Sequence, residues 1–575
     1  ASNKVLLDLF GDARPAPLAT ISKVTNPLKA LVIGAGPSGL VAAKYLLEST
    51  EPEYHVTIVE SSTNIGGSFT NKVYDDCRLV SSKYLTAFSD HRMPEDTGLC
   101  PDHPSAEQYV SYLESYADRF GIRKCIQFGC KVLSLKDSNL DVVDKKGGDS
   151  SGYDVQYKNL DDQIITGKYD VVAVCSGLHN TPYVPTLFSD AKNNIAKRFK
   201  GQIIHSSQYK DPSIFANKRV LILGCGETAM DIAHRAVCNP QTKSVALSVR
   251  RGFLSIPHNL AMGRPLDVFI TNLFEHAYEH PWVHALQLRW VLSTIFIRLF
   301  LFLTGSSLGF NQWAVQTSPV RRGYHIINKS HAAMSHLNVP LKRQSMWGRF
   351  WMWAYQEGSL RPIESFHQTQ VTDVEDNGVT VRFCDGRTYD ADLIVLATGY
   401  KQSFPFLDET IRMDFQRESL QAKESLGSKG DAKKYRIEED YLPSEHFIAS
   451  RTRPRLGFIG FVRPNVGAIP PMSELQVMWW LERMQGRVNM ITKAGSPSYM
   501  VLGRKYPYGV DYGNYMHRVA EDFDAAPTLS TLAKSDHPLK ALYTYCIGQS
   551  MISLFRLQGR YKSDTCWDIV NGGLW

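Results

Sequence analysis

Two apolar segments, each followed by a glycine-rich turn and a helix-like stretch, dominate the pattern of the chain. The first segment is Ala30–Ile33, followed by a helix through Leu47 and a second strand, His55–Glu60. The other segment is Arg219–Leu223, whose own second strand is Ser244–Val249. The order strand, turn, helix and strand is typical of a dinucleotide-binding unit. We therefore predict an α/β fold that contains two such Rossmann-like units.

The first turn has the sequence that a bound dinucleotide requires. Gly34 permits a tight turn, Gly36 lets a pyrophosphate approach the backbone, and Gly39 allows close packing of helix on strand. Pro37 and Ser38 lie between these glycines. Glu60 ends the second strand 21 residues after Gly39, where a carboxylate can bind ribose hydroxyls. The flanking strands and this acid favour a nucleotide site over a plain turn.

The second turn has a related sequence but a different end to its second strand. It reads Gly224-Cys225-Gly226-Glu227-Thr228-Ala229. Its strand ends in Arg250 and Arg251 rather than in an acid. An acid there favours a free ribose 2′-hydroxyl, whereas an arginine accommodates a 2′-phosphate. The second unit is therefore predicted to bind NADPH in preference to NADH.

Outside these units, the pattern predicts two more strands that end in small-residue turns. They are Tyr169–Cys175 with Gly177, and Tyr389–Leu396 with Thr398, Gly399 and Tyr400. A helix is expected over 105–120, and short strands with polar turns over 131–158. The charged segment 418–441 is expected to be a surface excursion.

The segment between the two units carries a motif of its own. Phe199 to Tyr209 reads Phe-x-Gly-x-x-x-His-x-x-x-Tyr. This spacing resembles the identifying motif of the flavin-containing monooxygenases. The related Baeyer-Villiger enzymes usually have Trp followed by Pro or Asp where this chain has Tyr209 and Lys210. The resemblance covers roughly residues 29–485 in ordered motifs, which is more specific than one glycine-rich turn.

Other segments extend the resemblance and assign cofactors to the two units. Gly66, Gly67, Ser68 and Phe69 are similar to an extension typical of flavin-binding members, with Phe where Trp is usual. FAD is therefore expected in the first unit and NADPH in the second. Ala397–Tyr400 resembles the segment that returns the chain to the FAD domain. The run through Gly467 and Ile469 to Gln476 resembles the one that closes over the flavin ring.

The resemblance also implies a reaction. NADPH would reduce the FAD, the reduced flavin would capture molecular oxygen, and a flavin hydroperoxide would pass one oxygen atom to a soft nucleophile, by N- or S-oxygenation of a small molecule. The oxygen chemistry belongs to the cofactor, so neither a catalytic triad nor a metal site is expected. His205 and Tyr209 would be the catalytic motif residues that steady the nicotinamide.

One departure from the family pattern keeps other functions open. Family members commonly place Asn beside the flavin, and by spacing Val80 occupies that position, with Ser81 and Ser82 as alternative hydrogen-bond donors. A first alternative is Baeyer-Villiger oxygenation of a ketone. A second is an uncoupled flavoprotein that oxidises NADPH and releases hydrogen peroxide.

These segments predict the following division of the chain. Residues 1–28 are an N-terminal extension, 29–212 the first part of the FAD domain, 213–389 the NADPH domain, and 390–575 the second part of the FAD domain with a C-terminal extension. Residues 252–345 are expected to be a helical insertion in the NADPH domain.

Within the insertion, residues 282–310 are the most apolar stretch. Arg289 and Arg298 interrupt them, which argues against a spanning helix because a span needs about 20 predominantly apolar residues. A buried helical subdomain or a lid over the substrate entrance is the preferred interpretation. Peripheral membrane contact through 282–310 is the alternative.

Composition adds few constraints. A net charge of +7 is spread along 575 residues rather than gathered in blocks, so nucleic-acid binding is not expected. Ten cysteines without zinc-type spacing suggest reduced thiols in an intracellular compartment. The N-terminus shows no signal-peptide pattern. A cytoplasmic protein is predicted, with membrane association and a homo-oligomer as open alternatives.

Overall fold

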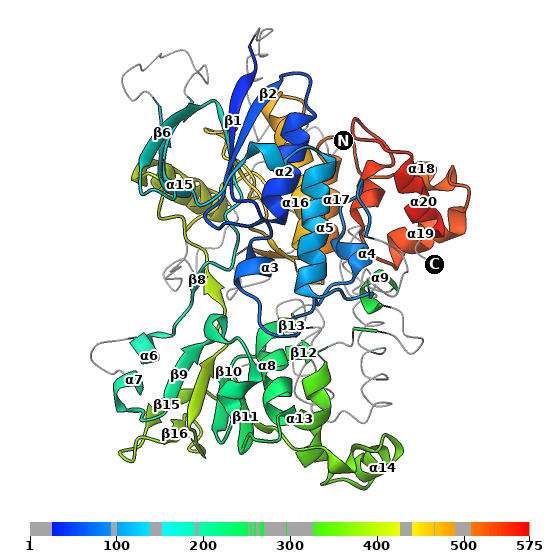
Figure 1. Cartoon of the computed structure of the whole chain (residues 1–575). Coiled ribbons are helices and arrows are strands. Elements are labelled where there is room, and N and C mark those ends of the chain that lie inside the picture. Colours follow the sequence, from blue (N-terminus) through cyan, green and yellow to red (C-terminus); the bar gives the residue numbers. More distant parts are fainter. Residues whose placement is uncertain are drawn as a thin grey trace.

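Two halves, each built on its own parallel sheet, make up the molecule (Figure 1). The computed structural model describes 26–93, 101–138, 152–189, 195–250, 331–425, 440–464, 466–488 and 508–573, with short pieces at 253–255, 258–259, 265–269, 295, 299 and 326–328. The first and last parts of the described chain form one half. The middle part forms the other, so the second domain is inserted in the first.

The first domain contains a five-stranded parallel sheet in the order β20-β7-β1-β2-β3. Its strands are β1 (Leu28–Ile33), β2 (Tyr54–Val59), β3 (Ile126–Gln127), β7 (Val171–Val174) and β20 (Leu456–Phe458). β7 is buried at every position, as expected of a strand covered on both faces of a parallel sheet. The helices beside this sheet include α2 (Pro37–Leu47), α5 (Ala106–Arg119) and α16 (Ile469–Met484) (Figure 1).

The second domain contains another five-stranded parallel sheet, in the order β14-β11-β10-β18-β9. Its strands are β9 (Gln202–His205), β10 (Arg219–Leu223), β11 (Ser244–Val249), β14 (Glu364–His367) and β18 (Leu393–Leu396). β9 and β18 lie outside the range 213–389 that the sequence predicted for this domain. The sheet therefore draws strands from beyond both predicted boundaries.

Among the described residues, two three-stranded antiparallel sheets accompany the parallel ones. The first domain carries β4 (Lys131–Asp137) and β5 (Tyr153–Lys158), which agree with the short strands expected over 131–158, and β6 (Ile164–Tyr169), which lies beyond that range. The second domain carries β15 (Val371–Val374), β16 (Thr380–Phe383) and β17 (Thr388–Asp390).

The chain crosses between the domains at two adjacent linkers. β8 (Thr181–Pro182) lies on the way into the second domain and β19 (Tyr400–Lys401) on the way back, and the two pair antiparallel. The Tyr183 amide also donates to the Gly399 carbonyl at 2.9 Å. The linkers are thus tied to each other, and Figure 1 shows β8 between the two halves.

The expected helix over 105–120 is α5, and its sequence explains its start. The Ser105 side chain accepts a hydrogen bond from the Gln108 amide, and the Gln108 side chain accepts one from the Ser105 amide. This reciprocal pair is a capping box, which satisfies two backbone donors at the helix end. Tyr109, Leu113 and Tyr116 are fully buried, which agrees with a packing role.

Most of the predicted insertion lies outside the described residues. Its described elements are β12 (Phe253–Ser255), α9 (Leu266–Phe269), β13 (Ile326–Asn328) and α13 (Ala332–Lys342). Of 282–310 only Ile295 and Leu299 are described, so its interpretation as a lid, buried subdomain or membrane contact lies outside them. None of the described helices combines the length and apolar character needed to cross a membrane.

A helical region forms the C-terminal end of the described chain. It contains α17 (Tyr512–Glu521), α18 (Leu529–Ala533), α19 (Pro538–Cys546) and α20 (Thr565–Asp568), drawn in orange and red in Figure 1. Its apolar residues share one core with α2 and α16. The C-terminal region is therefore part of the first domain.

Candidate functional site

The first glycine turn is closed on two sides by backbone. Gly34 has φ +108°, and a Cβ there would lie 2.7 Å from the carbonyl oxygen of Cys175, the residue after β7. A Cβ on Gly39 would lie 1.9 Å from the carbonyl oxygen of Gly34. No side chain fits at either position, so both glycines are needed for strand β1 and helix α2 to approach each other.

Gly36 faces a second glycine loop. Its backbone is extended, and a Cβ on it would lie 3.7 Å from the Cα of Gly67, which itself has φ +60°. The Gly66 amide donates to the Ala35 carbonyl at 3.2 Å. The two glycine segments that the sequence assigned to FAD therefore meet, and together they leave a stretch of backbone without side chains at the start of α2. Such a surface fits a pyrophosphate at a helix N-terminus.

Beyond Gly67 the chain forms a short helix, none of whose residues is buried. Ser68 and Phe69 open the short helix α3 (Ser68–Asn71). The Phe69 ring packs edge-on against Tyr109, with 4.6 Å between ring centroids. Phe69 therefore anchors the second glycine loop to α5.

Glu60 lies directly after β2 and its side chain faces the turn. It is 5% exposed. Oε2 accepts from the Ala35 amide at 2.7 Å, and Oε1 accepts from the amide and the hydroxyl of Ser62, both at 2.8 Å. A carboxylate oxygen can accept two hydrogen bonds, so Oε2 retains one acceptor position. The residues of this turn therefore fit the predicted FAD, and Glu60 can still accept a further hydrogen bond.

The segment predicted to close over the flavin ring lies beside the same turn. Ser38 Oγ is 2.9 Å from Ser473 Oγ on α16. Gly460 has φ +84°, and a Cβ there would lie 2.2 Å from Ser38 Oγ. Gly467 is covered by the Tyr512 ring, and Ile469 is the first residue of α16. Residues more than 400 positions apart in the sequence thus form one side of the site.

The second turn repeats the geometry of the first. Gly224 has φ +130°, and a Cβ there would lie 2.2 Å from the carbonyl oxygen of Ala397, the residue after β18. A Cβ on Gly226 would have no neighbour within 4 Å. Glu227 and Thr228 begin α8 (Glu227–Cys238), and Ala229 is 1% exposed. The backbone at Gly226 is open to a cofactor, which fits a dinucleotide phosphate at the start of α8.

The arginines predicted to select NADPH are only partly described. Arg250 follows β11 and is exposed at the end of this strand. Arg251 lies outside the described residues. The exposure of Arg250 leaves its guanidinium available to a ligand.

His205 ties the second domain to the returning linker. Its Nδ1 accepts a hydrogen bond from the Ser207 amide at 3.1 Å, so Nδ1 carries no proton. Nε2 therefore carries the proton and donates to the Gly399 carbonyl at 2.9 Å. Burial lowers the pKa of His205, and the bond to Gly399 offsets part of that shift. The neutral ring satisfies both contacts, and Tyr400 packs edge-on against it with 5.3 Å between centroids.

Tyr209, the other motif residue, lies in the core of the second domain. It is 1% exposed, and its ring stacks on Phe215 with 5.4 Å between centroids. Tyr74 of the first domain packs against it at 5.3 Å. Burial raises the pKa of Tyr209 to about 12. The structure therefore places Tyr209 where two aromatic rings of different domains meet, apart from the hydrogen bonds of His205.

Two further predicted residues, Gly177 and Thr398, lie on the linkers. Gly177 has φ +84° and no neighbour within 4 Å of an added Cβ. The Thr398 hydroxyl donates to the Tyr183 carbonyl. Thr398 and Gly399 thus bind the same residue of the outgoing linker.

Val80, Ser81 and Ser82 precede the short helix α4 (Lys83–Thr86). Ser82 is fully buried, its hydroxyl accepts from the Leu85 amide, and its own amide donates to Asp267 at 2.8 Å. Val80 and Ser81 are half-buried. Asp267 belongs to α9, so a described piece of the insertion is bound to the segment predicted to lie beside the flavin.

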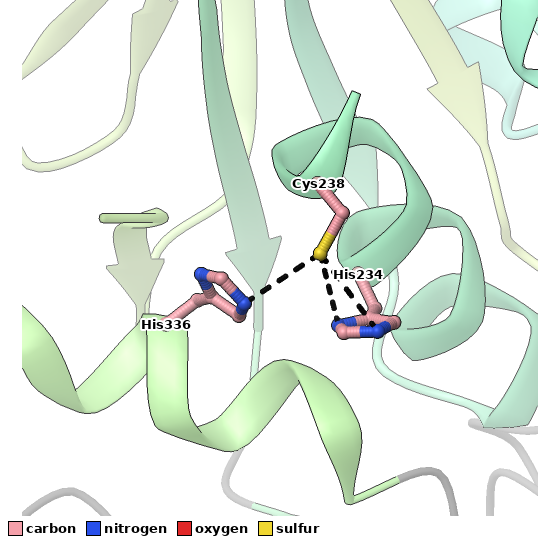
Figure 2. A group of neighbouring side chains, drawn as sticks. All are labelled: His234, Cys238 and His336. Carbon is pink, nitrogen blue, oxygen red and sulfur yellow. Dashed lines mark hydrogen bonds between the residues drawn. The ribbon is translucent and has the colours of Figure 1, made fainter. Parts of the chain in front are cut away.

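Among the described residues, one group of side chains has the composition of a metal site. His234, Cys238 and His336 place their ligand atoms within 4.8 Å of one another (Figure 2). They lie on α8 and α13 of the second domain, and the sequence did not predict them.

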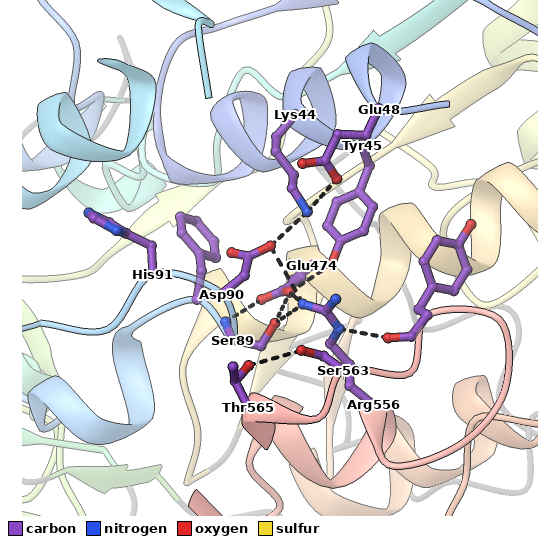
Figure 3. Close-up of polar contacts among 12 residues, drawn as sticks. Lys44, Tyr45, Glu48, Ser89, Asp90, His91, Glu474, Arg556, Ser563 and Thr565 are labelled. Carbon is purple, nitrogen blue, oxygen red and sulfur yellow. Dashed lines mark hydrogen bonds and ion pairs between the residues drawn. The ribbon is translucent and has the colours of Figure 1, made fainter. Parts of the chain in front are cut away.

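The sequence also did not predict a buried polar network that lies behind α2. Glu474 on α16 is fully buried and accepts from Tyr45 on α2 and from the amide and hydroxyl of Ser89. Arg556, from the C-terminal region, donates to the Ser89 hydroxyl at 2.6 Å and lies 3.6 Å from Glu474. Figure 3 shows these side chains converging from four segments. Burial, with the nearby Asp90, raises the pKa of Glu474.

Comparison with known proteins decides the family. A family model described as flavin-binding monooxygenase-like matches residues 28–294. Monooxygenase PC-14 of Penicillium crustosum is 31% identical, over 92% of this chain and 90% of its own length. The chain belongs to the flavin-binding monooxygenase family.

Other flavin monooxygenases match over similar lengths. Flavin-containing monooxygenase 1 of Homo sapiens is 28% identical, over 92% of this chain and 89% of its own length. The solved structure of S-allyl-L-cysteine S-oxygenase from Allium sativum superposes with a TM-score of 0.52 at 17% identity, over 86% of this chain and 88% of that one. The likeness in structure supports the fold.

These findings confirm the family, the fold class and the cofactors predicted from the sequence. The protein is an α/β flavin monooxygenase with two Rossmann-like domains that binds FAD and uses NADPH. The roles of single residues remain predictions, and the geometry above supplies the means to test them.

Proposed function

We propose that this flavin monooxygenase transfers one oxygen atom from molecular oxygen to a soft nucleophile, by N- or S-oxygenation of a small molecule, with NADPH as the reductant. The motif from Phe199 to Tyr209 carries the proposal. Its last residue, Tyr209, and the following Lys210 differ from the Trp with Pro or Asp usual in Baeyer-Villiger enzymes. Its His205 binds Gly399 where the two domains join.

Bound FAD would supply the oxygen-transfer chemistry, and the first domain would hold it in place. Glu60 Oε2 would accept from a ribose hydroxyl, and Gly36 and Gly67 would allow the pyrophosphate to approach the start of α2. The positive end of the α2 dipole favours that negative charge. These residues bind and orient the cofactor and do not exchange protons with the substrate.

The second domain would hold NADPH in the same manner. The open backbone at Gly226 admits the pyrophosphate to the start of α8. Arg250 and Arg251 are proposed to bind the 2′-phosphate, because a guanidinium pairs with phosphate in a bidentate geometry. Through its hydrogen bond to Gly399, His205 would hold the returning linker against the end of β9 and so help to fix the second domain relative to the first.

Product analysis with the FAD-loaded protein tests the proposal. The protein is supplied with NADPH, oxygen and a panel of amines, sulfides and ketones, and the products are identified by mass spectrometry. N-oxides or sulfoxides containing one oxygen atom from labelled oxygen gas are expected. Esters or lactones from the ketones, with amines and sulfides unchanged, would instead establish a Baeyer-Villiger enzyme.

Val80 favours a second candidate, an uncoupled NADPH oxidase. The family pattern places an amide at this position, and a valine side chain donates no hydrogen bond. One hydrogen peroxide per NADPH consumed, with no oxygenated product from any compound of the panel, would favour this candidate. The same assay therefore separates the three functions.

A further inference from the structure

Three side chains of the second domain converge on one point outside the predicted cofactor sites. His234 and Cys238 are four residues apart on α8, so they lie on the same face of the helix. His336 reaches them from α13 (Figure 2). The Cys238 sulfur is 3.7 Å from His234 Nδ1 and 3.8 Å from His336 Nε2.

The sulfur–nitrogen separations, 3.8 Å to His234 Nε2 included, are close to the sulfur–nitrogen edge of a tetrahedral metal site, and all the ligand atoms lie within 4.8 Å of one another. Zinc binds sulfur at about 2.3 Å and imidazole nitrogen at about 2.0–2.1 Å, so two ligands at the tetrahedral angle are about 3.6 Å apart. Hydrogen bonds are the alternative account of the arrangement, because the thiol can donate its one proton to His336 Nε2 while its sulfur accepts from the ring of His234.

His336 is prepared for metal binding by its second ring nitrogen. Its Nδ1 lies 2.7 Å from the Arg361 carbonyl oxygen. A carbonyl can only accept, so Nδ1 carries the proton and Nε2 presents a lone pair toward Cys238. Histidine ligands in metal sites are typically oriented by a bond of this kind to a backbone carbonyl. His336 is 6% exposed, so its ring orientation is also fixed by packing.

We propose that His234, Cys238 and His336 bind a divalent transition metal of the zinc type, with water as the fourth ligand. Mixed nitrogen and sulfur ligands in a tetrahedral arrangement suit zinc. On binding, a metal–sulfur bond replaces the thiol S–H bond and the proton leaves to solvent. Cys238 is exposed, which gives the ion a path to the site and leaves room for the water.

The position of the site in the fold indicates that a bound metal would act on stability and not on the oxygenation reaction. α8 has 12 residues, so it is about 18 Å long. Cys238 is its last residue and Gly226 precedes its first. A metal would therefore join the far end of α8 to α13 without contacting the predicted NADPH phosphates. It should stabilise the second domain and leave the oxygenation rate unchanged.

Thiol protection provides a site-specific test in the wild-type protein. The FAD-loaded protein is treated with a chelator, divided, incubated with or without zinc, and alkylated. Labelling of each cysteine is then measured by mass spectrometry. We expect zinc to slow the labelling of Cys238 at least about tenfold and to leave Cys384, another exposed cysteine, unaffected. Equal labelling of Cys238 with and without zinc would overturn the proposal.

Ligand variants test the two histidines. In His336→Gln and in His234→Gln, at least about tenfold more zinc should be needed to protect Cys238, because each variant removes one of three protein ligands. Flavin content and the thermal unfolding curve without metal establish that each variant is folded. Protection that persists unchanged in both variants would show that zinc binds Cys238 without these histidines.

Cobalt gives an independent readout of coordination. Added to the chelator-treated protein, Co²⁺ in a tetrahedral site with a thiolate ligand should produce absorption in the red, beyond the flavin bands, that zinc abolishes by competition. The band should be absent in Cys238→Ser and present in Cys384→Ser. A band of equal strength in Cys238→Ser would place the metal elsewhere and contradict the proposal.

Discussion

Gly36 and Gly39 are three residues apart, yet a methyl group would meet different surroundings at each. At Gly39 it would lie 1.9 Å from a carbonyl oxygen, so Gly39→Ala should destabilise the protein by about 1–3 kcal/mol and lose flavin. At Gly36 it would lie 3.7 Å from Gly67 Cα, an ordinary contact, at a φ of −77°. Gly36→Ala should therefore fold normally and still lose flavin.

Two measurements separate the effects. The ratio of flavin to protein absorbance reports bound FAD, and thermal unfolding of the FAD-free protein reports the fold. We expect both to fall in Gly39→Ala and only the first to fall in Gly36→Ala. Full flavin occupancy in Gly36→Ala would contradict the prediction that the backbone at this position contacts the cofactor.

Val80 stands where the family resemblance predicts an Asn beside the flavin. If no other donor replaces the amide of the usual Asn, the wild type should release hydrogen peroxide when NADPH is supplied without substrate. Losing one hydrogen bond typically costs about 1–3 kcal/mol. Val80→Asn should therefore release several-fold less peroxide per NADPH, measured with a peroxidase-coupled assay. An unchanged or larger release would mean that Ser81, Ser82 or bound NADP⁺ already supplies the donor.

At the scale of elements, local patterns predicted most of the fold. The strands β1, β2, β10 and β11 and the helices α2 and α8 are each set by a short apolar run next to a glycine turn, and the structure contains all of them. The pairing of β9 with β18 could not be predicted in this way. Four residues of β9 do not distinguish an edge strand of the second sheet from a linker, because only partners nearly 200 residues away decide it.

The end of β11 is predicted to select between NADPH and NADH. A charge-assisted contact to the 2′-phosphate contributes about 1.5–3 kcal/mol, or roughly a ten- to hundredfold preference. Arg250→Ala combined with Arg251→Ala should weaken the binding of NADPH by that factor and barely change the binding of NADH. The dependence of the rate of flavin reduction on the concentration of each cofactor, followed in a stopped-flow instrument, measures both affinities. Lys243→Ala, at the opposite and also exposed end of the strand, is the matched control. Equal losses of affinity for NADPH and NADH would show that the two arginines have a structural role instead.

At the scale of the whole molecule, His205 and Gly399 connect the two domains. His205→Ala removes the hydrogen bond and the edge contact with Tyr400, so the second domain should be held less firmly. We expect flavin reduction by saturating NADPH to slow by about tenfold, the rate factor that corresponds to one net hydrogen bond of about 1.4 kcal/mol. FAD content should not change, because His205 does not contact the first glycine turn.

The contact between His205 and Gly399 also predicts how the stability of the protein depends on pH. The pKa of His205 is lower in the folded protein than in the unfolded chain, so the folded state prefers the neutral ring. Its contribution to stability is present above the unfolded pKa of about 6.5 and declines as the pH falls below that value. The stability difference between wild type and His205→Ala should therefore shrink from pH 7.5 to pH 5.5, measured by urea unfolding. A difference that grows on acidification would contradict a neutral His205.

Contacts between distant segments could not be predicted from the sequence. Ser89 and Arg556 are separated by 467 positions, and Asp267 reaches Ser82 from within the insertion. Each is an ordinary polar residue with no periodic or spaced partner nearby. Their positions depend on how whole domains pack, and one sequence without relatives contains no signal for that.

The buried pair of Arg556 and Glu474 should carry much of the attachment of the C-terminal region. Arg556→Met leaves the Glu474 carboxylate, which is fully buried, without its cation. Removing one partner of a buried ion pair typically destabilises by about 3–5 kcal/mol. Arg560→Met, in the same segment but half exposed beside Glu482, should cost less than about 1 kcal/mol. Urea unfolding of both variants measures the difference.

Two further results distinguish an unpaired charge from lost packing. Adding Glu474→Gln to Arg556→Met should recover part of the stability, because the amide carries no charge to leave buried. Acidification should also reduce the difference in the free energy of unfolding between Arg556→Met and the wild type. Burial already raises the pKa of Glu474, removal of the guanidinium raises it further, and a carboxyl with a raised folded pKa regains stability as the pH falls through that pKa. Two results would contradict this prediction: a loss of stability in Arg556→Met no larger than in Arg560→Met, or a loss that is the same at every pH. Either would mean that the Arg556 side chain acts through packing alone. The C-terminal region would then be attached by its apolar contacts with α16.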